Sequence, residues 1–163
     1  MDTAKVNSAR FIVELGPGVG GITKAVLEAA GQDFRLLSIE INPNFHAFIK
    51  NIRDERLIAH LGDARELGQI IDRYGLGAPD AVISGIPFST MSESCGSKII
   101  RSIFDVLAPG GRFVAYQLSS RVISLCKPVM GEGEIMLEFL NIPPMRVCCW
   151  RKSNGNGDKA TKG

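Results

Sequence analysis

The 163-residue sequence lacks several features that would place it in common classes of protein. No uncharged apolar run approaches the roughly 18 to 20 residues that a membrane-spanning helix needs. The start has no charged region, apolar stretch and small-residue cleavage site in series, so we expect no secretion signal. The four cysteines form no C-x-x-C pair, which argues against the usual zinc and redox motifs. We therefore expect reduced thiols, no metal site and a cytoplasmic location.

The composition is that of one globular domain. Hydrophobic residues make up 45% and charged residues 22% of the chain, which excludes general disorder. The length is too small for two large domains. The net charge of +2 is too low to imply a nucleic-acid partner by itself. Residues 153–163 are mostly polar, so we predict one domain over residues 1–152 and a disordered tail over 153–163.

Short β-branched runs alternate with helical patterns along the chain. They predict strands at 11–15, 35–40, 57–60, 80–84 and 112–117, and a final hairpin formed by 134–140 and 145–151. Helices are predicted at 21–30, 42–52, 64–74 and 94–107, the second of which would turn its apolar side chains to the core, namely Phe45, Phe48, Ile49 and Ile52. This alternation indicates a mainly parallel sheet, which binds ligands beyond the carboxyl ends of its strands.

The run from Glu14 to Gly20 reads E-x-G-x-G-x-G and follows the first predicted strand. Glycine lets the backbone approach a ligand where any Cβ would clash, so we expect Gly16, Gly18 and Gly20 to border a cofactor. From Gly16 the run also fits G-x-G-x-x-G, the dinucleotide fingerprint. The short chain and the acid at Glu14 favour S-adenosylmethionine instead. A carboxylate is repelled by a pyrophosphate but attracted by a sulfonium or an ammonium group.

Two further acids stand where a predicted strand ends. Glu40 lies 20 residues after Gly20, the spacing at which an acid accepts hydrogen bonds from ribose hydroxyls. The alternative for Glu40 is an ordinary surface glutamate. Asp63, followed by Ala64, comes after the third strand, where methyltransferases commonly hold an acid for the adenine amino group. The alternative for Asp63 is a helix N-cap. Together with the glycine loop, these acids predict an S-adenosylmethionine site.

The segment Ser84-Gly85-Ile86-Pro87-Phe88 follows the fourth predicted strand. Methyltransferases that act on adenine in DNA or ribosomal RNA have Asn-Pro-Pro-Tyr or Asn-Leu-Pro-Tyr here, and the amide accepts a hydrogen bond from the target amine. Aligned on the proline, this chain has Gly85 in place of the amide, which counts against a base as acceptor. We expect Ser84 to border the cofactor, and Pro87 and Phe88 to face the acceptor. Alternatively, the last two only end the strand and plug the core.

The sequence resembles the soluble, membrane-associating phosphatidylethanolamine N-methyltransferases of bacteria, which are relatives of the ribosomal-RNA adenine dimethylases. The resemblance covers about residues 11–152 and rests on Val13–Gly20, Glu40 with Asn42-Pro43, Gly62–Ala64, Val82–Phe88, Leu107–Phe113 and Asn141–Pro144. It implies an α/β fold with a Rossmann-like, seven-stranded methyltransferase sheet, mainly parallel with a C-terminal antiparallel hairpin. It also implies S-adenosylmethionine as cofactor and methyl transfer to the amine of phosphatidylethanolamine.

Methyl transfer from a sulfonium is an in-line displacement that depends mainly on positioning and desolvation. The sequence offers no Ser/His/Asp arrangement. Tyr116, late in the fifth strand, is the candidate group beside the acceptor amine, with a core position as its alternative. His46 and His60 are expected to be structural. Several basic residues could meet lipid phosphates or only solvent: Arg121, Lys127, Arg146, Arg151 and Lys152.

Enzymes of the resembling family carry an N-terminal helical segment that helps to cap the cofactor and meet the membrane. Met1–Arg10 is too short to supply it, so we expect the cap helices to be missing. The predicted partner is a phospholipid at the inner face of the membrane, with no transmembrane span and no nucleic acid. Two alternatives stay open: a methyltransferase acting on RNA, protein or a small molecule, and a shortened relative that binds the cofactor without catalysis.

Overall fold

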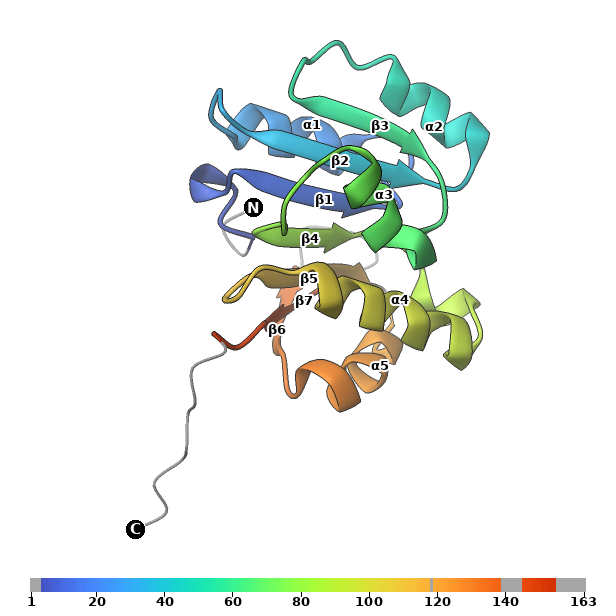
Figure 1. The fold of residues 1–163 in the computed structure, drawn as a ribbon. Helices are drawn as coiled ribbons and strands as arrows, with labels where there is room; N and C mark the ends of the chain where they lie inside the picture. Colours follow the sequence, from blue (N-terminus) through green and yellow to red (C-terminus); the bar gives the residue numbers. More distant parts are fainter. Residues whose placement is uncertain (1–3, 118, 139–144, 155–163) are drawn as a thin grey trace.

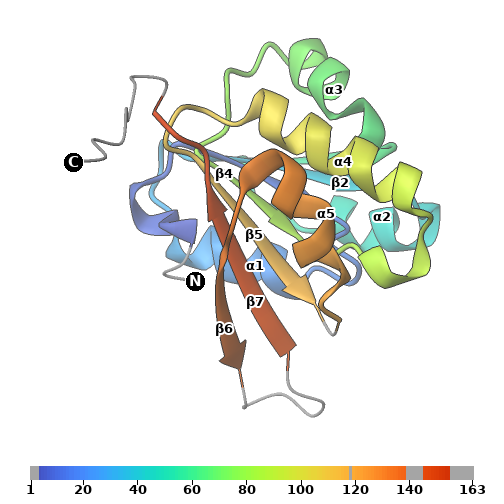
Figure 2. The same cartoon turned by 90° about the horizontal axis from the view of Figure 1, so that it is seen from below.

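The strands form one seven-stranded sheet in a computed structural model of the chain, which describes residues 4–117, 119–138 and 145–154. The strands are β1 (Phe11–Leu15), β2 (Arg35–Glu40), β3 (Leu57–Leu61), β4 (Ala81–Ser84), β5 (Arg112–Gln117), β6 (Glu134–Glu138) and β7 (Met145–Arg151). Their order is β3-β2-β1-β4-β5-β7-β6, and the first five are mutually parallel. β7 runs antiparallel to both β5 and β6 (Figure 2). The predicted fold class is therefore confirmed.

Helices cover both faces of this sheet. They are α1 (Gly21–Ala29), α2 (Pro43–Lys50), α3 (Leu67–Arg73), α4 (Glu93–Val106) and α5 (Arg121–Met130). The buried side chains of α3, α4 and α5 join one hydrophobic cluster with the sheet, and those of α1 join a second cluster. Figure 1 shows α3, α4 and α5 in front of the strands. The carboxyl ends of β1 to β4 meet at one edge, where a ligand site is expected.

The four predicted helices and the seven predicted strands lie within one or a few residues of the observed ones. α5 was not among the predicted elements. It contains Pro128, which removes a backbone donor and interrupts a helical pattern, and its first turn has no side-chain cap. The predicted tail after residue 152 falls largely outside the described residues, as does Asn141–Pro144.

The prediction of which α2 side chains face the core was partly wrong. Ile49 is buried, and Ile52 packs against the second core cluster, as expected. Phe45 and Phe48, however, are 40% and 55% exposed. α2 lies at the β2–β3 end of the sheet and packs against those two strands, so only a narrow stripe of the helix meets the core.

Candidate cofactor site

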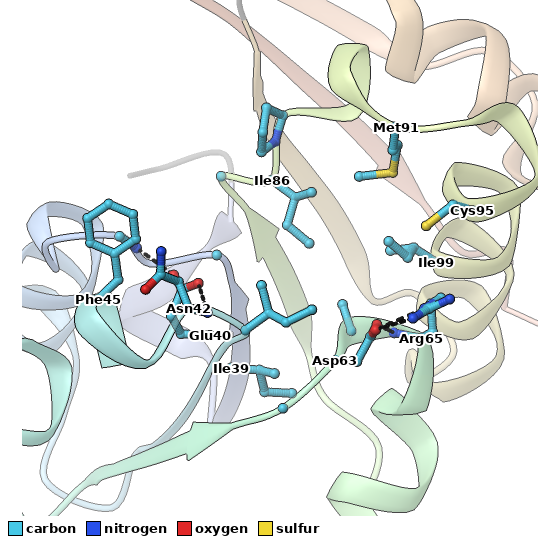
Figure 3. Close-up of a pocket in the computed structure, with 17 residues that line it drawn as sticks. Ile39, Glu40, Asn42, Phe45, Asp63, Arg65, Ile86, Met91, Cys95 and Ile99 are labelled. Carbon is cyan, nitrogen blue, oxygen red and sulfur yellow. Dashed lines mark hydrogen bonds and ion pairs between the residues drawn. The ribbon is translucent and has the colours of Figure 1, made fainter. Parts of the chain in front are cut away.

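A cavity of about 530 Å³ opens at the carboxyl ends of β1 to β4 (Figure 3). This volume is in the range of small-molecule sites. Of the residues predicted to bind a cofactor or face an acceptor, six line the cavity: Gly16, Gly18, Glu40, Asp63, Ala64 and Pro87. The remaining five lie outside its lining: Glu14, Gly20, Ser84, Phe88 and Tyr116.

The glycine loop turns through three left-handed residues, with φ of 68° at Gly16, 57° at Gly18 and 87° at Gly20. Other residues adopt this conformation rarely. A Cβ added to Gly18 would meet no protein atom within 4 Å, so the space above it is open. A Cβ on Gly20 would come within 3.0 Å of Ile49 and 3.2 Å of Ile52. Gly18 therefore leaves room for a ligand, whereas Gly20 lets the loop pack closely on the segment around α2.

Glu40 joins the glycine loop to the start of α2. Its Oε2 accepts a hydrogen bond from the backbone N–H of Gly18 at 3.1 Å, and its Oε1 accepts one from Asn42 at 2.9 Å. The side chain is largely buried and lines the cavity, so the alternative of a free surface glutamate is wrong. Each carboxylate oxygen has lone-pair capacity beyond its one observed bond. Glu40 can therefore accept from the two neighbouring hydroxyls of a ribose.

Glu14 lies beneath the glycine loop. It is 1% exposed, and its Oε2 accepts hydrogen bonds from the hydroxyls of Thr23 and Ser38, each at 2.7 Å. Its Oε1 is buried without a protein partner. These contacts tie β1, α1 and β2 together below the loop, while a direct contact of Glu14 with the cofactor stays a prediction. Ser38, a hydroxyl inside a buried strand, was a sequence signal that could have revealed this cluster.

Burial raises the pKa of Glu14 above its ordinary value of 4.5. The folded state therefore binds a proton more tightly than the unfolded state does. As the pH falls from 8 towards 4.5, Glu14 takes up its proton in the folded state before it does so in the unfolded state. The free energy of unfolding of the wild type should therefore rise relative to that of Glu14→Gln over this range. One unit of pKa difference corresponds to about 1.4 kcal/mol and so to about 3–6 °C in a domain of this size. Thermal melts of both proteins at pH 8, 7, 6 and 5 measure this, and parallel curves would contradict it.

Asp63 caps the short 3-10 turn Ala64–Glu66. Its Oδ1 accepts from the backbone N–H of Arg65 at 2.8 Å, and its Oδ2 pairs with the Arg65 guanidinium through Nε at 2.9 Å. The Arg65 side chain thereby holds the pKa of Asp63 below its usual range, so the carboxylate stays charged near neutral pH. The N-cap alternative is confirmed. The adenine contact stays a prediction, for which Oδ1 keeps a free acceptor position.

The loop after β4 lies against the glycine loop. The backbone N–H of Gly85 donates to the carbonyl of Leu15 at 2.9 Å, and a Cβ on Gly85 would lie 2.8 Å from the carbonyl oxygen of Gly16. Only glycine fits there unless one of the two loops moves. Ser84 is fully buried and accepts from the N–H of Ile86 at 3.2 Å, so its hydroxyl shapes the loop.

The neighbouring residues Pro87 and Phe88 have different surroundings at the end of this loop. Pro87 is exposed and lines the cavity, as predicted for a residue facing the acceptor. Phe88 is fully buried in the core cluster formed with α4 and α5. The alternative in which the aromatic ring plugs the core therefore describes Phe88, because the turn at Phe88–Thr90 directs it inward.

Two neighbouring residues of β5, Tyr116 and Gln117, pack in different parts of the molecule. Gln117 is buried, and its amide donates to the carbonyl of Ile86 at 2.7 Å, which holds the β4 loop from the next strand. The sequence prediction missed this contact, although a polar residue ending a buried strand was a signal for it. Tyr116 is half-buried against the other core cluster and does not line the cavity. Its core alternative matches that position, and a role at the acceptor amine stays a prediction.

Both histidines lie outside the cavity lining. His60 Nδ1 contacts the hydroxyl of Tyr74 at 2.9 Å, and burial lowers its pKa. Among the basic residues considered for lipid phosphates, Lys152 donates to carbonyls of Phe104 and Leu107 at the end of α4, which suits the negative end of a helix. Lys127 pairs with Glu132 on the surface.

Within the described residues, no group of three or more histidine, cysteine or acidic side chains is arranged to hold a metal ion. Within the same residues, no helix has the length and apolar character that a membrane span requires.

No protein-family model matches the chain. It is 33% identical over 108 residues to an ornithine lipid N-methyltransferase of Singulisphaera acidiphila, a match that covers 65% of this chain and 56% of that protein. It is also 33% identical over 105 residues to the mitochondrial dimethyladenosine transferase 1 of Caenorhabditis elegans, covering 55% of this chain and 28% of that one. The chain thus spans little more than half the length of the first of these relatives.

Solved structures share the fold at lower identity. The N-methyltransferase NodS from Bradyrhizobium japonicum superposes with a TM-score of 0.75 at 14% identity, over 93% of this chain and 90% of that one. The same enzyme in complex with S-adenosylhomocysteine gives 0.74 at 14% identity, over 92% and 81%. Aeropyrum pernix fibrillarin, which holds S-adenosylmethionine, gives 0.70 at 18% identity, over 89% and 67%. With these likenesses and its strand order, the chain has the Rossmann-like methyltransferase fold.

Proposed function

We propose that this chain is an S-adenosylmethionine-dependent methyltransferase whose acceptor is the amine of a membrane lipid. The observation that carries the cofactor assignment is the meeting of the open glycine loop at Gly18 with Glu40 and Asp63 around one cavity. Glycine backbone and two acids suit a ligand that combines a ribose, an adenine and an amino-acid arm. The methyltransferase fold and the relatives that bind this cofactor support the same assignment.

The acids that line the cavity are already oriented in a way that suits the cofactor. Glu40, already oriented by Gly18 and Asn42, would accept from the ribose hydroxyls. Asp63, held by Arg65, would accept from the adenine amino group. When bound, S-adenosylmethionine supplies a methyl group that passes to a neutral amine, leaving S-adenosylhomocysteine and releasing a proton. The chain's own contribution would be orientation and exclusion of water, which can supply much of the rate enhancement of a displacement.

The lipid amine is favoured over an adenine base by the loop after β4. In enzymes acting on adenine, an amide at the position of Gly85 accepts from the target amine, and here a side chain at that position would collide with Gly16. The similarity to an ornithine lipid N-methyltransferase adds to this argument. Ornithine lipid and phosphatidylethanolamine both offer a primary amine, and we include each as a substrate. Similarity to dimethyladenosine transferases keeps RNA as the alternative to be tested.

A methylation assay decides among these acceptors. The chain is incubated with S-adenosylmethionine labelled in its methyl group and with vesicles of phosphatidylcholine that contain ornithine lipid or phosphatidylethanolamine. Vesicles of phosphatidylcholine alone and ribosomal RNA serve as the other acceptors. We expect label in the amine-bearing lipid only. Label in RNA alone would replace the lipid by the alternative acceptor, and cofactor binding without label in any acceptor would indicate a non-catalytic module.

A matched pair of variants tests the site in the same assay. Glu40→Gln keeps one carbonyl acceptor for the two N–H groups that Glu40 now serves, and it loses the charge. We expect S-adenosylhomocysteine to bind about tenfold or more weakly, since hydrogen bonds to charged groups contribute about 1.5–3 kcal/mol. Glu28→Gln, an exposed glutamate on α1, should bind as the wild type does. Isothermal titration calorimetry measures both, and equal affinities would refute the placement of the ribose.

A further inference from the structure

Five large apolar side chains remain exposed beside the cavity mouth. They are Val19, Ile41, Phe45, Phe48 and Leu61, with exposed fractions of 63%, 67%, 40%, 55% and 48%. We call this set the apolar rim. It contains five of the eight large hydrophobic residues that are exposed in the described part of the chain. Exposed apolar patches that surround a cavity mark places where a partner or a ligand binds.

The rim is continuous with the cavity. Ile41 and Phe45 line the cavity wall, and Figure 3 shows Phe45 beside Asn42 at its edge. Phe45 and Phe48 are three residues apart on α2 and so lie on the same side of the helix, and Ile41 directly precedes the N-cap residue Asn42. An occupant of the cavity that is longer than the cavity itself would therefore extend onto apolar surface.

Val19 and Leu61 border α2 from the neighbouring elements. The glycine loop that carries Val19 packs on α2, as the 3.0 Å approach of a Gly20 Cβ to Ile49 shows. Leu61 ends β3, the strand against which α2 packs. The rim thus gathers side chains from two loops, one helix and one strand end around a single opening.

Exposed basic residues stand in the segments that carry the rim. Residues 16–27 and 41–53, which contribute four of its five side chains, contain Lys24, Lys50 and Arg53 and no carboxylate. The acids that directly follow these two ranges are Glu28, which is exposed on α1, and Asp54, which pairs with Arg56. The acids that line the cavity are engaged, because Glu40 is buried and accepts two backbone N–H groups and Asp63 pairs with Arg65. A surface that combines apolar side chains with exposed lysine and arginine side chains suits an anionic lipid layer.

We propose that the apolar rim docks on the surface of an anionic lipid bilayer, so that a lipid amine enters the cavity while its apolar part stays beside α2. This inference deepens the proposed function and rests on it for the identity of the cavity's ligand. An amphiphile matches the arrangement because the cavity offers the polar side chains of Glu40, Asn42 and Asp63, whereas the rim offers apolar side chains only. A soluble protein or a second copy of this chain would have no comparable reason to follow the cavity wall.

Vesicle co-sedimentation tests the docking without catalysis. The chain is mixed with vesicles of 30% phosphatidylglycerol in phosphatidylcholine, and with vesicles of phosphatidylcholine alone. Phe48→Ser removes an aromatic ring from the rim without touching the cavity lining, and we expect it to weaken partitioning to the anionic vesicles about tenfold. The matched control is Ile135→Ser, which removes a side chain of similar exposure, 49%, from the edge strand β6. It should partition as the wild type does.

A conservative variant guards against unfolding as the explanation. Phe48→Trp should keep vesicle binding, and its emission should shift to the blue when anionic vesicles are added, because interfacial tryptophan favours this depth. The native Trp150 is buried and provides a constant background. Equal partitioning of Phe48→Ser and wild type, or no wild-type binding to anionic vesicles, would overturn the docking. A wild-type dimer that Phe48→Ser converts to a monomer would also overturn it, in favour of self-association.

The two proposals fail separately. Binding of S-adenosylhomocysteine is measured without vesicles, and vesicle binding is measured without cofactor. If Phe48→Ser loses vesicle binding while the wild type methylates no lipid, the docking surface is supported and the lipid methyltransferase activity is not. If the wild type methylates a lipid in detergent and Phe48→Ser binds vesicles normally, the activity is supported and the docking surface is refuted.

Discussion

Replacing Gly85 with asparagine is expected to abolish binding of S-adenosylhomocysteine and not to create an adenine methyltransferase. The first atom of any side chain at this position would lie 2.8 Å from the carbonyl oxygen of Gly16, a backbone atom that can move only with the glycine loop. Overpacking of this kind costs about 1–3 kcal/mol or more, and here the displaced atoms form the ligand site itself. We expect affinity to fall about hundredfold or more.

The matched control for this variant is Gly77→Asn. Gly77 lies in an exposed loop where an added Cβ would meet no atom within 4 Å, so the substitution should leave both affinity and stability close to the wild type. Calorimetry measures the affinity and thermal unfolding the stability. If Gly85→Asn bound S-adenosylhomocysteine normally, the close contact between the two loops would not be a feature of the active protein.

The second large effect is expected from Gly18→Val, which should remove cofactor binding while leaving most of the stability. An added Cβ meets no protein atom within 4 Å, so the valine side chain enters the space left open for a ligand. It also places a β-branched residue at φ of 57°, a strain of about 1–3 kcal/mol. We expect S-adenosylhomocysteine to bind at least about hundredfold more weakly.

Gly75→Val separates the two causes. Gly75 has a similar φ of 63° and equally open surroundings, but it lies after α3 and outside the cavity lining. It should lose stability like Gly18→Val and keep cofactor binding. Calorimetry and urea unfolding of both variants measure the two effects. Loss of binding in both variants would attribute the effect to backbone strain, and unchanged binding in Gly18→Val would remove the glycine loop from the site.

The local parts of the site were predictable because each depends on a short run of residues. The glycines of the first loop need left-handed backbone, which the three positive φ values bear out. The acid that ends β2 has an apolar strand before it and Asn42-Pro43 after it, so its position at the carboxyl edge of the sheet follows from the pattern. The N-cap role of Asp63 was similarly foreseen as an alternative.

Contacts between distant segments were not predictable in the same way. Thr23 and Ser38 meet at Glu14 only because β2 lies beside β1 in the sheet and α1 packs on the face of these strands. Gln117 reaches Ile86 because β5 lies beside β4, and no local pattern records which strand is adjacent. The exposure of Phe48 depends on the width of the stripe of α2 that the edge of the sheet covers. The spacing of apolar residues along one helix does not reveal that width.

By itself, the sequence determined the alternation of strands and helices, the fold class and the glycine-and-acid character of the candidate site. These depend on backbone preferences and hydrophobic period, which act over a few residues. Only the tertiary structure decided that Gly85 is closed to any side chain, that Phe88 belongs to the core and that an apolar rim borders the cavity. Those properties arise from close packing between segments far apart in the chain, where a few tenths of an ångström determine what fits.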